Sequence, residues 1–315
     1  MSGDGDQFEV RRITADSPDH HLALHLAFGL QPPPGRASPA RQVADLLANV
    51  QRSGGSIDLL LGAYQNEELL CACLAVESPG AAALVLVPSD VRASGNYRAT
   101  VAVLRALQTA AWQQSIALLE VLVAPESDML GRTLHDAGFR YLTRLRYLRR
   151  HGAPTGQSSH VPRDLEWVRY APDRELLFED AVERTYIQSL DCPELTGLRQ
   201  TAQVLAGHRA TGVFDPALWW MAKRNGQPVG VILLNRILGE RALEVVYMGV
   251  ALSARGTGVA DALLQRAVDA AAKRGVNIMA LAVDQRNTSA RRMYARWDFV
   301  ETGVRDAWIA SPPRV

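Results

Sequence analysis

The sequence lacks any uninterrupted apolar run of about 18 residues, the length a helix needs to cross a bilayer. Its first ten residues, MSGDGDQFEV, are acidic and polar, whereas a secretory signal peptide opens with basic residues and an apolar stretch. We therefore expect no membrane-spanning segment and no membrane partner, and we expect a cytoplasmic protein.

Cysteine and one-sided charge are scarce as well. Three cysteines cannot form a disulfide framework, and no Cys/His quartet has zinc-site spacing, so no metal is expected. The formal net charge is +1 and basic residues occur at most in pairs, which argues against a nucleic-acid partner. What remains is the composition of a globular protein, 48% of it apolar.

The chain has length and an internal repeat. At 315 residues it is long enough for two domains, and the Gly/Pro/Ser-rich stretch RRHGAPTGQSSHVPRD divides it near the middle. AVDQRNTSARRMYARWDF (282–299) aligns with LVAPESDMLGRTLHDAGF (122–139), and the order of apolar runs and turns is shared further upstream. We predict a duplicated chain with domains at 1–150 and 164–315, joined by a linker at 151–163.

Periodicity gives the elements of the second half. Apolar runs of period two, bounded by turn residues, predict strands, and a switch to period 3.6 predicts helices. The expected strands are 164–170, 218–224, 228–238, 242–250, 276–283 and 303–310, and the expected helices are 173–188, 195–209, 258–274 and 288–297.

The stretch ARGTGVADALL (254–264) joins one of these strands to a helix. Glycines let the backbone approach a ligand closely, and the free N–H groups and dipole of a helix start favour bound phosphate. The plain alternative is a tight corner with glycines for steric reasons. The stretch is neither a P-loop nor G-x-G-x-x-G.

Two motifs in order carry a family resemblance. R-x-x-G-x-A (Arg255, Gly258, Ala260) is followed by N-x-x-A-x-x-x-Y (Asn287, Ala290, Tyr294) and a closing Phe299. Together they resemble the GNAT superfamily of N-acetyltransferases, clearly over 218–310 and more weakly over 164–217. The resemblance implies an α/β fold of two tandem GNAT-like domains, each a mixed, mostly antiparallel sheet flanked by helices, with acetyl-CoA as co-substrate.

The resemblance also implies site residues. The coenzyme A site would comprise Met248, Val250, Arg255, Gly256, Thr257, Gly258, Val259, Ala260 and Asn287. Tyr294 matches the family's general acid, and Glu244 matches a base used by some members. We expect Glu244 on the same strand face as Met248, about 13 Å away and acting through water. The structural alternatives are a helix cap for Asn287, a core aromatic for Tyr294 and a partly exposed strand residue for Glu244.

The first half lacks these groups. Ala81 aligns with Glu244, Ser127 with Asn287 and Leu134 with Tyr294, and SDVRASGNYRAT (89–100) lacks the phosphate-loop spacing. We therefore expect a degenerate, non-catalytic first domain, in which Gly95, flanked by Arg92 and Arg98, is what remains of a coenzyme A turn. A degenerate domain beside an intact one is similar to the arrangement of the mycothiol synthases.

The resemblance implies that the segment linking the first two helices, TYIQSLDCPELTGLR (185–199), frames the acceptor. Its Asp191 and Glu194 suit a cationic amine or form a solvated acidic loop. The expected function is transfer of an acetyl group from coenzyme A to a primary amine of a small molecule or peptide. The alternative is a non-catalytic acyl-CoA-binding or sensing module, which needs neither Glu244 nor Tyr294. A third interpretation is a structural duplicate without a ligand.

Overall fold

The computed structural model describes residues 8–28, 47–48, 50, 52, 54–88, 96–125, 128–152 and 162–313. The chain forms two compact units. The first comprises Met1–Leu142 and Arg305–Val315, and the second comprises Thr143–Val304. No helix among the described residues is long and apolar enough to span a membrane.

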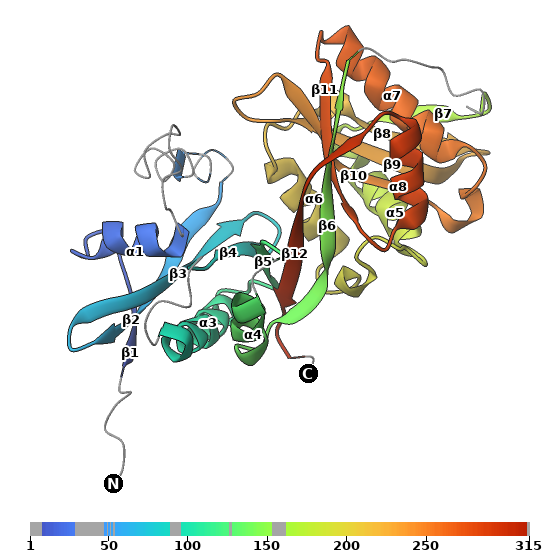
Figure 1. The fold of residues 1–315 in the computed structure, drawn as a ribbon. Helices are drawn as coiled ribbons and strands as arrows, with labels where there is room; N and C mark the ends of the chain where they lie inside the picture. Colours follow the sequence, from blue (N-terminus) through green and yellow to red (C-terminus); the bar gives the residue numbers. More distant parts are fainter. Residues whose placement is uncertain are drawn as a thin grey trace. The chain divides into compact units, whose positions relative to one another are not determined.

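The first unit is a sheet between two helix layers (Figure 1). Along β3, Ala72 and Leu74 pack toward α1, whereas Cys71, Cys73 and Ala75 pack toward α3 and α4. This alternation is that of a strand buried on both faces. The elements are β1 (Glu9–Arg12), α1 (His20–Phe28), β2 (Ser56–Gln65), β3 (Glu68–Ser78), β4 (Ala82–Leu86), α3 (Asn96–Gln113), β5 (Leu118–Val123) and α4 (Asp128–Asp136).

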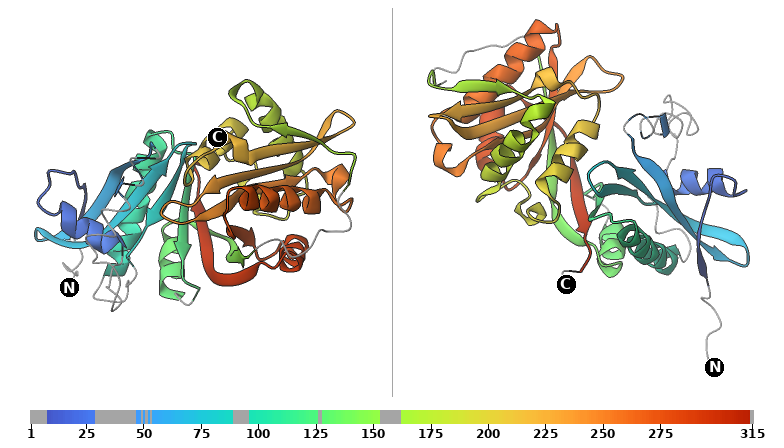
Figure 2. Two further views of the ribbon diagram at one scale, coloured as in Figure 1. Left: turned by 90° about the horizontal axis from the view of Figure 1, so that it is seen from above. Right: turned by 180° about the vertical axis from the view of Figure 1, so that it is seen from behind.

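The second unit repeats this plan, and Figure 2 shows helices on either side of its sheet. β9 runs through the middle, where Ile232 and Leu234 face α7 and α8 while Val231 and Leu233 face α5 and α6. The elements are β7 (Glu166–Arg169), α5 (Glu175–Tyr186), α6 (Thr201–Ala210), β8 (Trp219–Arg224), β9 (Gln227–Arg236), β10 (Ala242–Val250), α7 (Val259–Lys273), β11 (Ile278–Asp284) and α8 (Thr288–Arg296).

The registers of the two units show the duplication directly. In the first unit β4 pairs in parallel with β5 as Ala82↔Leu118, and in the second β10 pairs with β11 as Ala242↔Ile278. Both parallel ladders contain three residue pairs, and all other strand pairings recorded within the units are antiparallel. Each unit is therefore the mixed, mostly antiparallel sheet that the family resemblance implies.

The last strand of each unit comes from the other half of the chain. Residues 145–151 of β6 (Arg140–His151) pair with β11 in the second unit, and residues 306–310 of β12 (Val300–Ala310) pair with β5 in the first. The units therefore divide inside β6 and β12, whereas the sequence places the division at 151–163. The cause is long-range strand pairing, which leaves no local signal in the sequence.

Local signals explain the helix flanking the site. α7 is rich in alanine, the best helix former, and begins after Gly258, whose φ of 84° is in the left-handed region. It ends where Gly275 adopts φ 63° and the N–H groups of Gly275 and Val276 donate to Ala272 and Ala271. The observed span, Val259–Lys273, lies within the expected 258–274.

Candidate functional site

The second unit contains a cavity of about 600 Å³ between β10 and β11. The two strands pair only over 242–244 and 278–280, and then diverge. Residues 245–250 of β10 and 281–283 of β11 line the resulting space, which we call the β10–β11 cavity. Parts of α5, α7 and α8 complete its wall.

The glycine turn before α7 opens into this cavity. Gly256, Gly258 and Ala260 line it, and no side chain caps the first N–H groups of α7. A Cβ placed on Gly256, at φ 75°, would meet no atom within 4 Å, so the space beside the turn is open. Unbonded N–H groups at the positive end of a helix favour an anion in that space.

Two residues of the turn point elsewhere. The side chain of Val259 is fully buried in the core, and it therefore offers only main-chain groups to a ligand. The Thr257 hydroxyl donates to the carbonyl of Ala254 at 2.8 Å and accepts from Arg224 at 3.2 Å. Neither residue lines the β10–β11 cavity, whereas Met248 and Val250 do.

Arg255 uses its guanidinium to hold the end of α5. Its Nη atoms donate to the carbonyls of Thr185 at 3.1 Å, Ile187 at 2.7 Å and Gln188 at 2.7 Å, and Nε donates to Val250 at 3.2 Å. A cation at a helix C-terminus is also favoured by the helix dipole. In this structure Arg255 therefore joins the glycine turn to residues 185–188 at the end of α5. Arg255 also lines the cavity.

Tyr294 lies on α8 and lines the cavity. The residue is only 6% exposed, and its ring packs edge-on against Phe299 at 5.5 Å between centroids. The hydroxyl forms no hydrogen bond with any residue that the structure describes. Burial, and secondarily the charge of Asp191, raises the pKa of the phenol well above its usual value, so it is protonated at neutral pH.

Asn287 has both polar ends of its amide engaged. Its Oδ1 accepts from the N–H of Ala290 at 3.2 Å and from the Ser289 hydroxyl at 3.1 Å, so it caps α8. Its side chain also hydrogen-bonds Asp191. Asn287 therefore fixes the start of α8 and a carboxylate in the cavity wall.

Glu244 lies outside the lining of the β10–β11 cavity. Its cross-strand partner Asn235 bonds Trp219 Nε1 and carbonyls at the end of α6, which places Glu244 on the α5/α6 face. A β-bulge after Val245 shifts the register, and Met248 packs against the core under α7 and α8. Glu244 and Met248 therefore lie on opposite faces of β10, not on the one face expected. Burial raises the pKa of Glu244, and the charge of Arg149 opposes this.

The structure adds aromatic and acidic groups to the cavity wall near the end of α5. The hydroxyls of Tyr247 and Thr185 lie 2.6 Å apart, and Tyr186 packs edge-on against Tyr247. Burial raises the pKa of Tyr186 to about 12. These three residues and Asp191 line the cavity. Sequence reasoning singled out Asp191, whereas Tyr247 turns to this side only because of the bulge.

The corresponding positions of the first unit carry no such groups where they are described. Leu134, which aligns with Tyr294, is fully buried in the core. Ala81, which the sequence aligns with Glu244, has φ 56° and lies in the turn before β4. That alignment is wrong, because the parallel ladders place Leu84, opposite Glu120, at the position that Glu244 holds opposite Ala280. Ser127 and the turn 89–95, with Arg92 and Gly95, lie outside the described residues. Across the described parts of both units, no cluster of three or more His, Cys, Asp or Glu side chains could hold a metal.

Comparison with known proteins gives relatives by sequence. The profile of the acetyltransferase (GNAT) family matches residues 184–299. A mycothiol acetyltransferase of Streptomyces griseus subsp. griseus is 31% identical over 225 residues, covering 71% of this chain and 69% of that protein. A mycothiol acetyltransferase of Beutenbergia cavernae is 32% identical over 94 residues, which is 29% of this chain and only 31% of that protein's length.

Two solved structures share the fold over nearly the whole chain. A GCN5-related N-acetyltransferase from Sphaerobacter thermophilus has a TM-score of 0.61 at 19% identity, covering 99% of this chain and 98% of that one. A tandem GNAT protein from the clavulanic acid biosynthesis pathway has a TM-score of 0.51 at 13% identity, with coverages of 98% and 100%. At these identities the likeness concerns the fold alone.

Proposed function

The chain belongs to the acetyltransferase (GNAT) family, with two such domains in tandem, and from this membership we propose that it acetylates a primary amine of a small molecule or peptide, with acetyl-CoA as donor. The β10–β11 cavity carries the proposal. It joins an uncapped helix N-terminus to a buried phenol whose hydroxyl has no partner among the described residues. An anion-binding turn and a proton donor in one cavity suit acyl transfer from a phosphorylated thioester.

The glycine turn fits the pyrophosphate of this donor. The main-chain N–H groups of Gly256, Gly258, Val259 and Ala260 would bind it. The side chains of Val259 and Thr257 lie outside the cavity lining and do not block these groups. Met248 and Val250 would offer their main chain along the diverging edge of β10, as an added strand does. Arg255 and Asn287 would hold the walls through the contacts described above. When bound, acetyl-CoA supplies an activated acetyl group, and no metal is needed.

Two side chains would move protons in this proposal. Tyr294 would protonate the departing sulfur, since burial keeps its hydroxyl protonated. Glu244 remains our proposed base and would act through water from the α5/α6 face, where burial raises its pKa and so makes it a better proton acceptor. The first unit would be non-catalytic, because Leu134 aligns with Tyr294 and Leu84 takes the register position of Glu244.

The cysteine thiols bear on the compartment. Cys71 and Cys73 are buried in β3, Cys192 is half-buried, and all three are free. Burial raises the pKa of the Cys71 and Cys73 thiols, which makes them unreactive. Free thiols persist in reducing compartments, and we therefore propose a cytoplasmic location.

Calorimetric titration of the full chain with acetyl-CoA tests the proposed cofactor site. We expect binding at one site that is lost in Gly258→Glu, because a carboxylate would stand beside the phosphates. The matched control is Gly239→Glu, a second left-handed glycine with open space around it, which should bind like the wild type. A release assay for free coenzyme A against a panel of amines then tests transfer. Absence of binding by the wild-type chain would contradict the proposal.

A further inference from the structure

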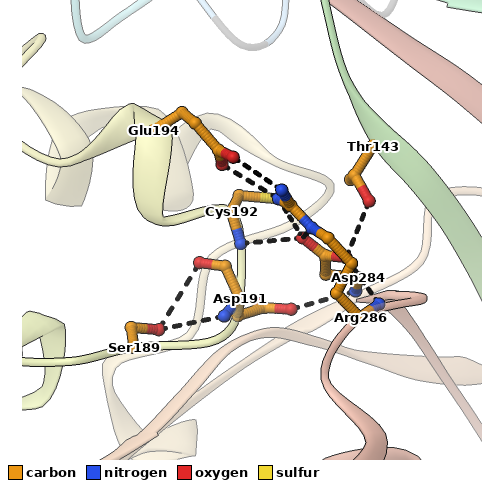
Figure 3. Close-up of polar contacts among 7 residues, drawn as sticks. All are labelled: Thr143, Ser189, Asp191, Cys192, Glu194, Asp284 and Arg286. Carbon is orange, nitrogen blue, oxygen red and sulfur yellow. Dashed lines mark hydrogen bonds and ion pairs between the residues drawn. The ribbon is translucent and has the colours of Figure 1, made fainter.

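Two carboxylates, those of Asp191 and Asp284, hold the segment 189–194 against the end of β11 (Figure 3). The Asp191 carboxylate accepts the N–H of Asp284 at 2.9 Å, and the Asp284 carboxylate accepts the N–H of Cys192 at 3.1 Å. Thr143 donates to Asp284 as well, at 2.7 Å. The Asp191 carboxylate thus binds the main chain at Asp284, and the Asp284 carboxylate binds the main chain at Cys192. These two hydrogen bonds hold Asp191 in place against the end of β11.

The guanidinium of Arg286 is already paired with two carboxylates, those of Glu194 and Asp284. Arg286 binds both Glu194 oxygens, at 2.6 and 2.9 Å, and also Asp284 at 2.7 Å. Burial alone would raise the pKa of Asp284, but the hydrogen bonds from Arg286, Thr143 and the main chain lower it overall. Asp284 and Glu194 therefore share one guanidinium, and the buried Asp284 is fully paired.

Asp191 is the carboxylate left without a cation. No Lys or Arg of the described residues lies within ion-pair distance of it, and Asp284, Arg286 and Glu194 already carry one negative charge in excess. An ionised Asp191 brings this group to a net charge of −2. A carboxylate accepts about four hydrogen bonds, so the two from Asp284 and Asn287 leave capacity for a ligand.

Asp191 also faces the proposed site of reaction. It lines the β10–β11 cavity together with Tyr247 and Tyr294, and although the residue has exposed atoms, its carboxyl group is largely surrounded by protein. Tyr294 lines the same cavity and is more than nine-tenths buried, and its hydroxyl has no hydrogen-bond partner among the described residues. The cavity thus contains a carboxylate without a neutralising cation and a phenol without a hydrogen-bond partner. A bound ligand can supply both a cation and a hydrogen-bonding group.

We propose that Asp191 binds the acceptor nitrogen as an ammonium ion and takes its proton, so that the acceptor is an amine that is cationic at neutral pH. This inference rests on the proposed function, because it concerns the same cavity. In the step assigned to Asp191, one N–H bond of the ammonium breaks and the proton passes to a carboxylate oxygen. The electron pair stays on nitrogen as the lone pair that attacks. The Asp191 carboxyl then passes the proton to the water through which Glu244 acts, so Asp191 is the first acceptor of the proton and Glu244 the base that takes it up.

The surroundings of Asp191 suit this role. Burial and the negative charge of Asp284 raise its pKa, although the N–H of Asp284, the Asn287 amide and the charge of Arg286 oppose the shift. A carboxylate with a raised pKa is a better proton acceptor than one in water. Glu194 cannot substitute, because it is bonded to Arg286 and lies outside the cavity lining.

The test uses two stable analogues and the full chain. S-(2-aminoethyl)-coenzyme A places an ammonium two carbons from the sulfur, and S-propyl-coenzyme A is its neutral counterpart. We expect calorimetry to show that the wild type binds the ammonium analogue about tenfold more tightly, the scale of a hydrogen bond to a charged group. In Asp191→Asn the preference should fall to about one, with affinity for the propyl analogue unchanged as evidence of an intact site.

Glu194→Gln is the matched control, since it removes a carboxylate from the same segment and should keep the preference. Glu244→Gln should keep it too. A wild type that binds both analogues equally would overturn the inference, as would a preference that survives Asp191→Asn or disappears in Glu244→Gln. Each of these results leaves the acetyl-CoA site standing. If neither analogue binds the wild type, the proposed function itself fails and this inference with it.

Discussion

A single residue difference separates the two units at the proposed point of proton transfer. Tyr294 lines the cavity, whereas the aligned Leu134 fills the core of the first unit. Replacing Tyr294 by Phe keeps the ring and its packing on Phe299 and removes only the hydroxyl. We expect turnover to fall about 100-fold, the usual contribution of a general acid, with acetyl-CoA affinity nearly unchanged. Release of coenzyme A under saturating donor measures the first quantity and calorimetry the second.

Tyr170→Phe serves as the control for that variant. Tyr170 lies on the α5/α6 side, and its hydroxyl contacts Glu175 and Arg209 rather than the cavity. Its loss should leave turnover unchanged. If Tyr294→Phe turned over as fast as the wild type, the role of proton donor would have to pass to another group.

For single residues, the sequence predicts how two side chains on one helix are spaced, but not which distant residues they contact. The interval from Asn287 to Tyr294 lies within one helix and its cap, so their relative placement follows from helix geometry. Asp191 and Asp284 are 93 residues apart, and nothing local indicates that each bonds the main chain at the other. The carbonyls at the end of α5 that Arg255 binds are 67 to 70 residues away, so no local pattern predicted its part in holding α5.

Among the elements, the end of α5 depends on one side chain from the glycine turn. Arg255→Ala removes the donors to the carbonyls of Thr185, Ile187 and Gln188. We expect the free energy of unfolding to drop by about 1–2 kcal/mol, because hydrogen bonds to a charged group are lost. Hydrogen exchange should rise selectively in 185–192, the segment that carries Asp191, and mass spectrometry of peptides locates that change.

Arg184→Ala is the comparison for this variant. Arg184 lies in the last turn of α5 but makes only an exposed ion pair with Asp180. Such pairs contribute about 0.5 kcal/mol or less, so exchange in 185–192 should stay near the wild-type rate. Equal effects of the two variants would mean that charge at the helix end, not the bonds of Arg255, holds the segment.

Most elements followed from local chemistry, but the expected helix 195–209 begins only at Thr201, and an irregularity inside one strand matters for the site. The expected strand 242–250 coincides with β10, since apolar runs and turn residues mark its ends. Its bulge left no mark, because Val245 and the next residue are both valines and either register is apolar. Strand alternation alone therefore put Glu244 on the wrong face relative to Met248.

For the whole molecule, the sequence predicted the internal repeat but not the exchange of the last strand between the two halves. The offset of 160 residues between the aligned halves reappears in the structure as Ala82↔Leu118 against Ala242↔Ile278. A duplication suggests that each half keeps its own last strand. Which copy of two similar strands pairs with β5 depends on contacts between distant segments, and local sequence patterns do not encode that choice.

The exchange predicts where a C-terminal truncation acts. A chain ending at 304 loses the strand residues 306–310 that pair with β5, and with them Trp308, which packs edge-on against Tyr141. β5 would become an exposed edge, so its amide protection should fall sharply. β11 keeps β6 on one side and β10 on the other, and its protection should persist.

Hydrogen exchange on peptides from 118–123 and 278–284 measures both strands in one experiment, and a chain ending at 310 retains the pairing and serves as its control. Loss of protection in β5 alone means that the last strand stabilises the first unit although the second half encodes it. Loss confined to β11 would instead show that each half keeps its own strand in solution. Acetyl-CoA binding should survive the cut at 304, because the glycine turn and Tyr294 lie in the second unit.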